Sequence, residues 1–407
     1  MSLSWGFRTL ECTLIEDRPK SSLNLVGRSR VAYRVPHGRE VAKTNEKQSM
    51  KSENRKSMFF VSLPKSGTVY TWTCLSDMTG LKMPEFHLLE GWEDYNSGRD
   101  FSCPDIYACG DYNTQLLRPE QMKIYLQGYV FGAHMQASYH NMRILEESGI
   151  TRITVLLRDP RDAFVSWVHH LRELGLPARN YHSRIYHIPR DYYDWSVEEQ
   201  FDFQVRSFLP TTINWVEGWL DYYAAADRKV DILFVLYDEL KRDPLSYMKR
   251  IFEFHEIDDV DYSKLVVPEE GKLHFRKGEH EQWRVDFSPG NQRLASEMLQ
   301  DRISRGFELA ARSHRGRLKY DQALSIGNYA LAAGAALEVI TQFPNSAESY
   351  QLLYRAAEAS KLDVADLRRK VAKELGEQSI AENFRYRYEL VAECKRLVQQ
   401  LGHVVPA

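Results

Sequence analysis

Short, almost wholly apolar runs of strand length recur through the middle of the chain, and polar or Pro/Gly-containing turns follow them. Runs of this kind are typical of strands in a parallel sheet that helices cover on both faces. Helical patterns follow two of the runs, at Thr68–Gly80 and around Tyr247–His255. The alternation predicts an α/β fold with a central, mostly parallel β-sheet flanked by helices. The four predicted strands are Met58–Pro64, Tyr129–Ala133, Ile153–Arg158 and Asp231–Leu240.

Changes in composition and hydrophobic pattern divide the chain into three predicted parts. Residues 1–57 are polar and lack a hydrophobic period toward their end, which indicates an N-terminal extension and linker. Residues 58–318 carry the α/β pattern and form the predicted main domain, and residues 319–407 form an Ala-rich, C-terminal helical extension. Within it, GNYALA and FPNSAE weakly resemble a tetratricopeptide repeat. Because only about one and a half periods are visible, a small helical appendage packed on the main domain is the simpler interpretation.

Charge and cysteine content exclude several classes of function. Lys and Arg number 54 against 56 Asp and Glu, a formal net charge of -2, so nothing global favours nucleic acid or an anionic membrane as a partner. Five scattered cysteines predict neither a disulfide framework nor a zinc site, and no cluster with metal-ligand spacing appears. No run reaches the roughly 18 apolar residues that span a bilayer, and the first residues lack the apolar core of a signal peptide. These features predict a soluble, cytoplasmic protein.

The strongest local feature is the turn PKSGT, Pro64–Thr68, between a predicted strand and a predicted helix. At such a turn the backbone N–H groups and the positive end of the helix dipole face outward, and Lys65 with the Ser66 and Thr68 hydroxyls adds donors for a phosphate. The turn is not a Walker A loop, because its Lys precedes the Gly and GxxxxGK[ST] is absent. A strand-to-helix turn with a solvated Lys is the structural alternative.

Two further segments carry candidate anion donors. RDPRDAFVS, Arg158–Ser166, begins at the end of another predicted strand, where ligands bind in open α/β sheets. Arg158 offers a planar fork suited to phosphate, although an Arg–Asp surface ion pair that caps a helix would look the same. FRKG, residues Phe275, Arg276, Lys277 and Gly278, places two cations beside a glycine.

Together, the three segments resemble the cytosolic-type sulfotransferase family, which has a P-loop-like fold and uses 3'-phosphoadenosine 5'-phosphosulfate (PAPS) as the sulfuryl donor. PKSGTVY matches the family's PKSGTTW, Arg158 with Ser166 matches its Arg-x7-Ser segment, and RKGEHEQW matches its RKGxxGDW. Two weaker marks agree: YDELKRDP from Tyr237 is similar to YEDLKKDP, and Trp215–Trp219 is similar to the segment before it. The resemblance covers roughly residues 58–290, in the family's order, and implies that residues 58–318 are the catalytic domain.

The resemblance also implies which residues hold the donor. Lys65, Ser66, Gly67 and Thr68 would bind the 5'-phosphosulfate, with Val69 where the family has Thr. The 3'-phosphate would meet Arg158, Ser166 and the segment Phe275, Arg276, Lys277 and Gly278. Tyr237 would contact adenine, and Tyr70 stands where the family has its stacking Trp, with Trp72 two residues on.

Sulfuryl transfer needs an aligned nucleophile, a base that removes its proton and a cation for the leaving oxygen, and it requires no metal. Lys65 is the expected cation, and a histidine with a near-neutral pKa suits the base. The resemblance implies His134, at the end of its predicted strand, whereas His87, His140 and the His169–His170 pair are rivals. The family's usual Lys two positions before this histidine is replaced by Gly132.

The function predicted from these residues is PAPS-dependent transfer of a sulfuryl group to a hydroxyl or amine nitrogen of a small-molecule acceptor. The alternatives are an inactive nucleotide-fold adaptor that binds partners through its C-terminal helices and a P-loop-type kinase. A kinase requires a GK[ST] pair and a Walker B acid, neither of which is found, and loss of Lys65 or Arg158 would favour the adaptor. The segment Leu171–Trp219 is rich in aromatic residues, which are typical of the lining of a small-molecule pocket. Its composition does not indicate which acceptor binds. The sequence also does not predict an oligomeric state.

Overall fold

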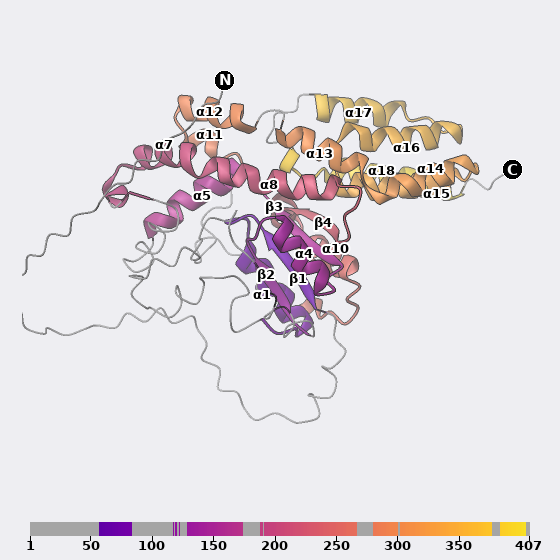
Figure 1. Ribbon diagram of the computed structural model, residues 1–407. Coiled ribbons are helices and arrows are strands. Elements are labelled where there is room, and N and C mark those ends of the chain that lie inside the picture. The colour runs from indigo at the N-terminus through magenta and orange to yellow at the C-terminus, as the bar shows by residue number, and fades with distance from the viewer. Residues whose placement is uncertain are drawn as a thin grey trace, which may run out of the picture. The chain divides into compact units, whose positions relative to one another are not determined.

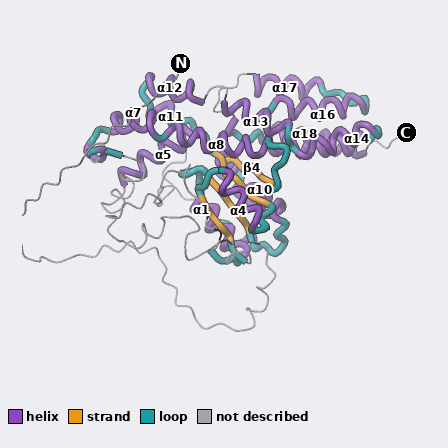
Figure 2. The backbone as a smooth tube through the Cα atoms, in the orientation of Figure 1, coloured by secondary structure: helices purple, strands orange, loops and turns teal. Residues whose placement is uncertain are grey.

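Four parallel strands form a sheet at the centre of the described structure, in the spatial order β2-β1-β3-β4 (Figures 1 and 2). The structure is a computed structural model, and it describes residues 57–83, 117, 119, 122, 128–173, 188, 189, 191–266, 280–299, 302–376 and 383–403. The strands are β1 (Met58–Ser62), β2 (Val130–Ala133), β3 (Arg152–Leu157) and β4 (Asp231–Leu236). The parallel sheet flanked by helices confirms the predicted fold class. The predicted N-terminal extension, residues 1–57, lies outside the described residues except for Ser57.

The helices between and after the strands follow the chain order expected of an α/β fold. In the first part of the chain they are α1 (Thr68–Thr79), α4 (Tyr139–Glu147), α5 (Pro160–Glu173), α7 (Val197–Ser207), α8 (Leu209–Ala224), α9 (Tyr237–Arg242) and α10 (Pro244–His255), with short 3-10 turns at Tyr192–Asp194 and Tyr262–Lys264. Each parallel crossover therefore includes at least one helix, as parallel strands require.

The fourth predicted strand was too long at its carboxyl end. The expected run Asp231–Leu240 ends as a strand at Leu236, and its last residues form the first turns of α9. Asp238 and Glu239 occupy the first turn of this helix, where the helix dipole favours acidic side chains. The apolar run of the strand continues without a break into Tyr237, the first residue of α9, so hydrophobicity alone did not mark the boundary.

The strands are buried on both faces, which explains their continuous apolar runs. On β1, Phe59 and Val61 join one hydrophobic cluster, while Met58 and Phe60 join another on the opposite face. The first cluster includes buried side chains of α4, α5, α7 and α8, and the second includes those of α1, α9 and α10. Side chains alternate across a strand, so a residue's position in the run decides which helical layer it meets.

The C-terminal third is helical, including the described part of residues 319–407 for which helix was predicted, and it shares the first cluster with the sheet. Its helices are α11 (Trp283–Asp286), α12 (Pro289–Leu299), α13 (Arg302–Arg312), α14 (Arg315–Ser325), α15 (Tyr329–Gln342), α16 (Ala347–Ala359), α17 (Ala365–Gly376) and α18 (Tyr388–His403). The end of α15 meets the edge strand, where the Gln342 side-chain amide donates to the Ile232 carbonyl at 3.2 Å. The division at residue 318 and the resemblance to a tetratricopeptide repeat stay predictions.

A substitution at Phe343 would measure how strongly the stability of the sheet depends on the C-terminal helices. Its ring is 1% exposed and lies 5.3 Å from the Tyr223 ring on α8 and 6.1 Å from the Phe234 ring on β4. Phe343→Ala is expected to lower the free energy of unfolding by about 3–5 kcal/mol in chemical denaturation, because it leaves a cavity in this junction. Leu331→Ala, in α15 but 55% exposed, is the control and should change it little. A separate transition for the C-terminal helices, with the sheet's transition unchanged, would contradict this coupling.

Candidate active site

Because all four strands are parallel, the segments that follow them emerge at one edge of the sheet. Lys65 follows β1, His134 follows β2, Arg158 follows β3 and Tyr237 follows β4. These four predicted site residues are separated by as many as 172 positions in the chain. The parallel topology alone brings them to the same edge.

The Lys65 loop leads from β1 into the N-terminus of α1. Gly67 is the residue before the helix and has φ 89°, and Lys65 also has a positive φ of 63°. A Cβ on Gly67 would lie 2.8 Å from a Leu240 side-chain carbon and 3.3 Å from the Tyr237 ring. The glycine is required both by its backbone conformation and by the close approach of α9.

Ser66 points to a ligand at this loop. Its residue is fully buried, and among the described residues its hydroxyl oxygen has no hydrogen-bond partner. An unpaired buried hydroxyl costs free energy, so its presence requires an explanation. Beside the N–H groups that begin α1, the hydroxyl is suited to donate to a bound phosphate or sulfate oxygen.

Arg158 lies against the same loop and is not a surface residue. It is 5% exposed, and its Nη1 donates to the Lys65 carbonyl at 2.6 Å. Its guanidinium carbon lies 4.3 Å from the centroid of the Tyr237 ring. The neighbouring Asp159 instead forms an ion pair with Arg161, at 2.7 Å between oxygen and nitrogen. Arg158 is thus a buried cation that joins the ends of β1, β3 and β4.

Burial and a neighbouring cation both act on the charge of Lys65. Burial, followed by repulsion from Arg158, lowers the pKa of Lys65 to about 8, while Glu173 acts in the opposite direction. An anion bound beside both cations would favour the protonated lysine and raise this pKa again. The loop is therefore prepared electrostatically for a strongly negative ligand.

His134 is fixed by the strand beside it. Its Nδ1 donates to the Ser62 carbonyl at 2.9 Å, so the basic lone pair of the neutral ring lies on Nε2. Burial, opposed by this hydrogen bond and reinforced by Lys65, lowers the pKa of His134 to about 4. The imidazole is neutral at pH 7, which is the state that a general base requires.

Two tryptophans on α8 hold the backbone around His134. The Trp215 indole N–H donates to the carbonyls of His134 and Met135, both at 2.9 Å, and the Trp219 indole donates to Met135 at 3.3 Å. The sequence similarity around Trp215–Trp219 therefore corresponds to support of the segment after β2. Both indoles are fully buried, which limits movement of this segment.

The remaining predicted donor residues differ in their surroundings. Val69 is 49% exposed on the first turn of α1, and Ser166 is half-buried on α5. The Tyr70 hydroxyl donates to the Val266 carbonyl at 2.6 Å. The residues predicted to bind the 3'-phosphate from the late loop, Phe275, Arg276, Lys277 and Gly278, lie outside the described residues, as does the rival base His87.

Trp72, the second aromatic near the predicted adenine position, packs against β2. The Trp72 indole donates to the Val130 carbonyl at 2.8 Å and packs on Gly132, where a Cβ would lie 3.0 Å from the ring. By the resemblance, Gly132 stands where the family has a lysine. In this chain the Trp72 indole packs against that position. Of the two aromatics, Tyr70 is the better candidate to stack on adenine.

Sequence reasoning missed Ser62, the last residue of β1. Its hydroxyl lies 2.7 Å from the Thr68 hydroxyl and 3.4 Å from His134 Nδ1, and its carbonyl orients the same ring. A serine inside the apolar run MFFVS was the available signal. Ser62 connects the Lys65 loop to the candidate base.

Metal and membrane features were searched in the part of the chain that the structure describes. No three His, Cys, Asp or Glu side chains gather there in a way that could hold a metal ion. Within the same residues, no helix combines the length and the apolar character needed to cross a membrane.

Comparisons with known proteins identify relatives of the chain. The chain is 23% identical over 181 residues to sulfotransferase 6B1 from Danio rerio, which covers 40% of this chain and 54% of the relative. It is 29% identical over 168 residues to cytosolic sulfotransferase 12 from Arabidopsis thaliana, covering 35% of this chain and 47% of the relative. The chain thus spans about half the length of the curated relatives it matches.

A solved structure with a related description is the mouse sulfotransferase SULT7A1 complexed with PAP, at 18% identity and a TM-score of 0.38, over 64% of this chain and 90% of that one. The profile of the family described as sulfotransferase domain matches residues 55–264, more than half of the chain. The matched region contains all four strands and the segments that end at Lys65, His134, Arg158 and Tyr237. The chain therefore belongs to the sulfotransferase domain family.

Proposed function

We propose that the protein transfers the sulfuryl group of PAPS to a hydroxyl or amine nitrogen of a small-molecule acceptor. The observation that carries this proposal is the meeting of Lys65, His134 and Arg158 at one sheet edge, with His134 oriented by the carbonyl of Ser62. The Lys65 loop follows β1, and the carbonyl that orients His134 belongs to Ser62, the last residue of β1. The same strand thus positions both the loop and the neutral base. Family membership supports the same class of reaction.

The residues of the Lys65 loop fit the phosphosulfate end of the donor. The unpaired hydroxyl of buried Ser66 and the N-terminus of α1 supply neutral donors, while Lys65 and Arg158 supply positive charge. Tyr237 contributes an aromatic surface beside Arg158, as expected of a residue that contacts adenine. The donor would neutralise the repulsion that lowers the pKa of Lys65.

The reaction is an in-line displacement at sulfur. The acceptor oxygen or nitrogen forms a bond to sulfur as the bond from sulfur to the 5'-phosphate oxygen breaks, leaving 3',5'-diphosphoadenosine. His134 takes the acceptor's proton at Nε2, and Lys65 stabilises the negative charge that grows on the leaving oxygen. The small-molecule acceptor and the cytoplasmic location remain predictions.

A direct test measures donor binding and turnover separately. Calorimetric titration with 3',5'-diphosphoadenosine should give binding, and incubation with PAPS and a panel of phenols, alcohols and amines should add one sulfate by mass. The Lys65→Ala protein serves as the turnover control. Absence of nucleotide binding in a folded wild-type protein would reject the proposal, and binding without sulfation of any acceptor class would favour the adaptor alternative.

A further inference from the structure

Short contacts connect His134 with the N-terminus of α1 through Ser62, the last residue of β1. Ser62 is fully buried, and its hydroxyl oxygen lies 2.7 Å from the Thr68 hydroxyl oxygen and 3.4 Å from His134 Nδ1. The Ser62 carbonyl oxygen lies 2.9 Å from the same Nδ1. Thr68 is half-buried and is the first residue of α1. A single buried serine thus contacts both the candidate base and the end of the Lys65 loop.

The carbonyl of Ser62 fixes the position of the proton on the His134 ring. A carbonyl oxygen can only accept a hydrogen bond, so the contact at 2.9 Å requires a proton on Nδ1. Because Nδ1 then carries a proton, it cannot accept a hydrogen bond from the Ser62 hydroxyl. Within the part of the chain that the structure describes, the hydrogen of that hydroxyl therefore has one acceptor, the oxygen of Thr68.

The burial of Ser62 decides the direction of the bond between the two hydroxyls. If Thr68 donated to Ser62, the Ser62 hydrogen would have no acceptor among the described residues, and an unpaired buried donor costs free energy. Ser62 therefore donates, and the Thr68 oxygen accepts. A hydroxyl has a single hydrogen, so the hydrogen of Thr68 can be donated to a different group.

The surroundings of Thr68 favour an anion as the acceptor of this hydrogen. Thr68 begins α1, a helix of 12 residues, and the N–H groups of a first turn lack partners within the helix. The Ser66 hydroxyl beside it is buried and has no partner among the described residues. Lys65 and Arg158 add positive charge to the same loop. These groups together are suited to a phosphate or sulfate oxygen.

We infer that Ser62 is a positioning residue for the Lys65 loop, because it directs the Thr68 hydroxyl to donate to the bound anion. The inference rests on the proposed function, in which this anion is the phosphosulfate of PAPS. Hydrogen bonds in a chain polarise one another. The positive charge that His134 gains when it takes the acceptor's proton should therefore strengthen the bond from Thr68 to the leaving phosphate. Ser62 thereby couples the base to the leaving group.

The test measures how the affinity of the full chain for 3',5'-diphosphoadenosine depends on the two hydroxyls. Ser62→Ala leaves the Thr68 hydroxyl free to turn, so the dissociation constant in calorimetry should rise by about 3- to 10-fold, the effect of one neutral hydrogen bond. Thr68→Val removes the donor itself and should raise the constant at least as much. In the Thr68→Val background, Ser62→Ala should have no further effect, since Ser62 acts through Thr68.

Two further substitutions at Ser62 separate positioning from a merely structural role. Ser62→Thr keeps the hydroxyl on a β-branched side chain, which suits the end of a strand, and should restore most of the affinity. Ser62→Cys has a similar size but only a weak S–H donor, and it should show a loss like that of Ser62→Ala. If Ser62→Ala does not fold, the comparison of Ser62→Cys with Ser62→Thr decides.

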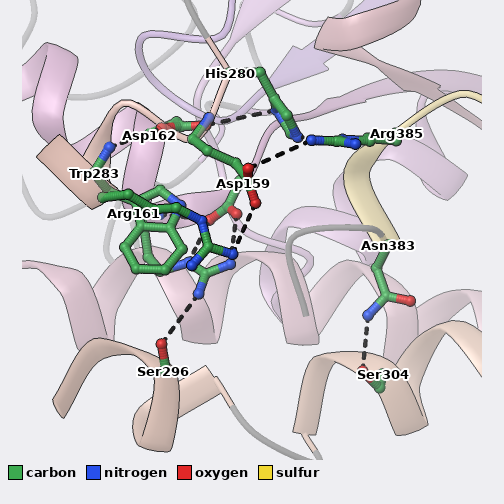
Figure 3. A network of polar contacts seen from close by, with 11 residues as sticks. Asp159, Arg161, Asp162, His280, Trp283, Ser296, Ser304, Asn383 and Arg385 are labelled. Carbon is green, nitrogen blue, oxygen red and sulfur yellow. Dashed lines mark hydrogen bonds and ion pairs between the residues drawn. The ribbon is translucent and has the colours of Figure 1, made fainter. Parts of the chain in front are cut away.

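Ser304→Ala is the matched control, because it removes another serine hydroxyl that joins distant parts of the chain. Ser304 lies on α13, and its hydroxyl accepts from the Asn383 side-chain amide at 2.7 Å (Figure 3). In the polar network of Figure 3, Arg385 Nε also donates to His280 Nε2 at 2.7 Å. Neither contact involves the Lys65 loop or the candidate base, so the affinity for 3',5'-diphosphoadenosine should stay unchanged.

The outcomes separate this inference from the proposed function. A wild-type protein that does not bind 3',5'-diphosphoadenosine would reject the proposed function itself. A wild type that binds, with Ser62→Ala and Ser62→Cys proteins of equal affinity, would overturn the positioning role alone. Additive losses from Ser62→Ala and Thr68→Val would also overturn it, because they would show that Ser62 does not act through Thr68. A folded Ser62→Thr protein that binds as weakly as Ser62→Cys would do the same.

Discussion

Replacing Lys65 with alanine is expected to lower kcat by about 100- to 1000-fold, the effect of removing one donor to charge that develops in the transition state. Lys65 lies in the loop after β1, next to Arg158. Among the described residues, the hydroxyl of Ser66 in the same loop has no hydrogen-bond partner. Charge on the leaving oxygen grows only as the bond to sulfur breaks, so the loss should fall mainly on kcat. Steady-state kinetics at saturating PAPS measures it, with thermal denaturation to compare folding.

Lys82→Ala is the matched control for Lys65, since it removes the same charge from an exposed side chain beyond the same helix. It should leave kcat within about twofold of the wild type, the usual range for surface substitutions. In the wild type, Lys65 loses its proton as pH rises through its pKa of about 8, so kcat/KM for PAPS should fall above that pH. A loss below tenfold in Lys65→Ala would remove the leaving-group role.

Replacing His134 with asparagine is expected to suppress turnover by about 100- to 10,000-fold, the usual contribution of a general base. Asparagine can still donate to the Ser62 carbonyl through its side-chain amide, but it has no basic nitrogen at the place of Nε2. The fold and the affinity for 3',5'-diphosphoadenosine should therefore be kept. Turnover at pH 7 with an alcohol acceptor and calorimetry with the nucleotide measure the two effects.

His140→Gln is both the control and a test of a rival base. The His140 ring lies on α4, with Nε2 at 3.3 Å from the Leu117 carbonyl, and the substitution should leave turnover unchanged. In the wild type, activity should fall as pH drops toward the His134 pKa of about 4, because the imidazole becomes protonated. Wild-type turnover in the His134 variant would assign the base to another residue.

The local pattern of apolar and polar residues predicted most of the strands. The apolar runs at Met58–Pro64, Tyr129–Ala133 and Ile153–Arg158 each match the strand that the structure has to within two residues at either end. Such runs are readable because strands buried on both faces need apolar side chains at every position. The boundary after Leu236 was misplaced, since apolar residues continue into α9 and the turn of the backbone there contains no Gly or Pro.

Local pattern also predicted the strand, the Gly-containing turn and the helix around Lys65, which the structure has. That phosphate binds to the backbone N–H groups of this turn stays a prediction. The pattern did not reveal Ser62 or Asp162, whose roles depend on residues far along the chain. Ser62 orients a histidine 72 positions later, and Asp162 holds the N–H group of Glu281 119 positions later. A single serine or aspartate in a sequence carries no sign of such a partner.

The sequence by itself determined the α/β class and the approximate positions of the strands, except for the end of β4, and it supplied the candidate side chains for binding anions and accepting a proton. Tertiary structure decided that β1 lies between β2 and β3, which places His134 and Arg158 on opposite sides of the Lys65 strand. It also decided that Arg385 reaches His280 across 105 positions. The physical reason is that hydrophobic periodicity and turn chemistry act over a few residues, whereas strand order and the geometry of a site depend on which distant surfaces pack together.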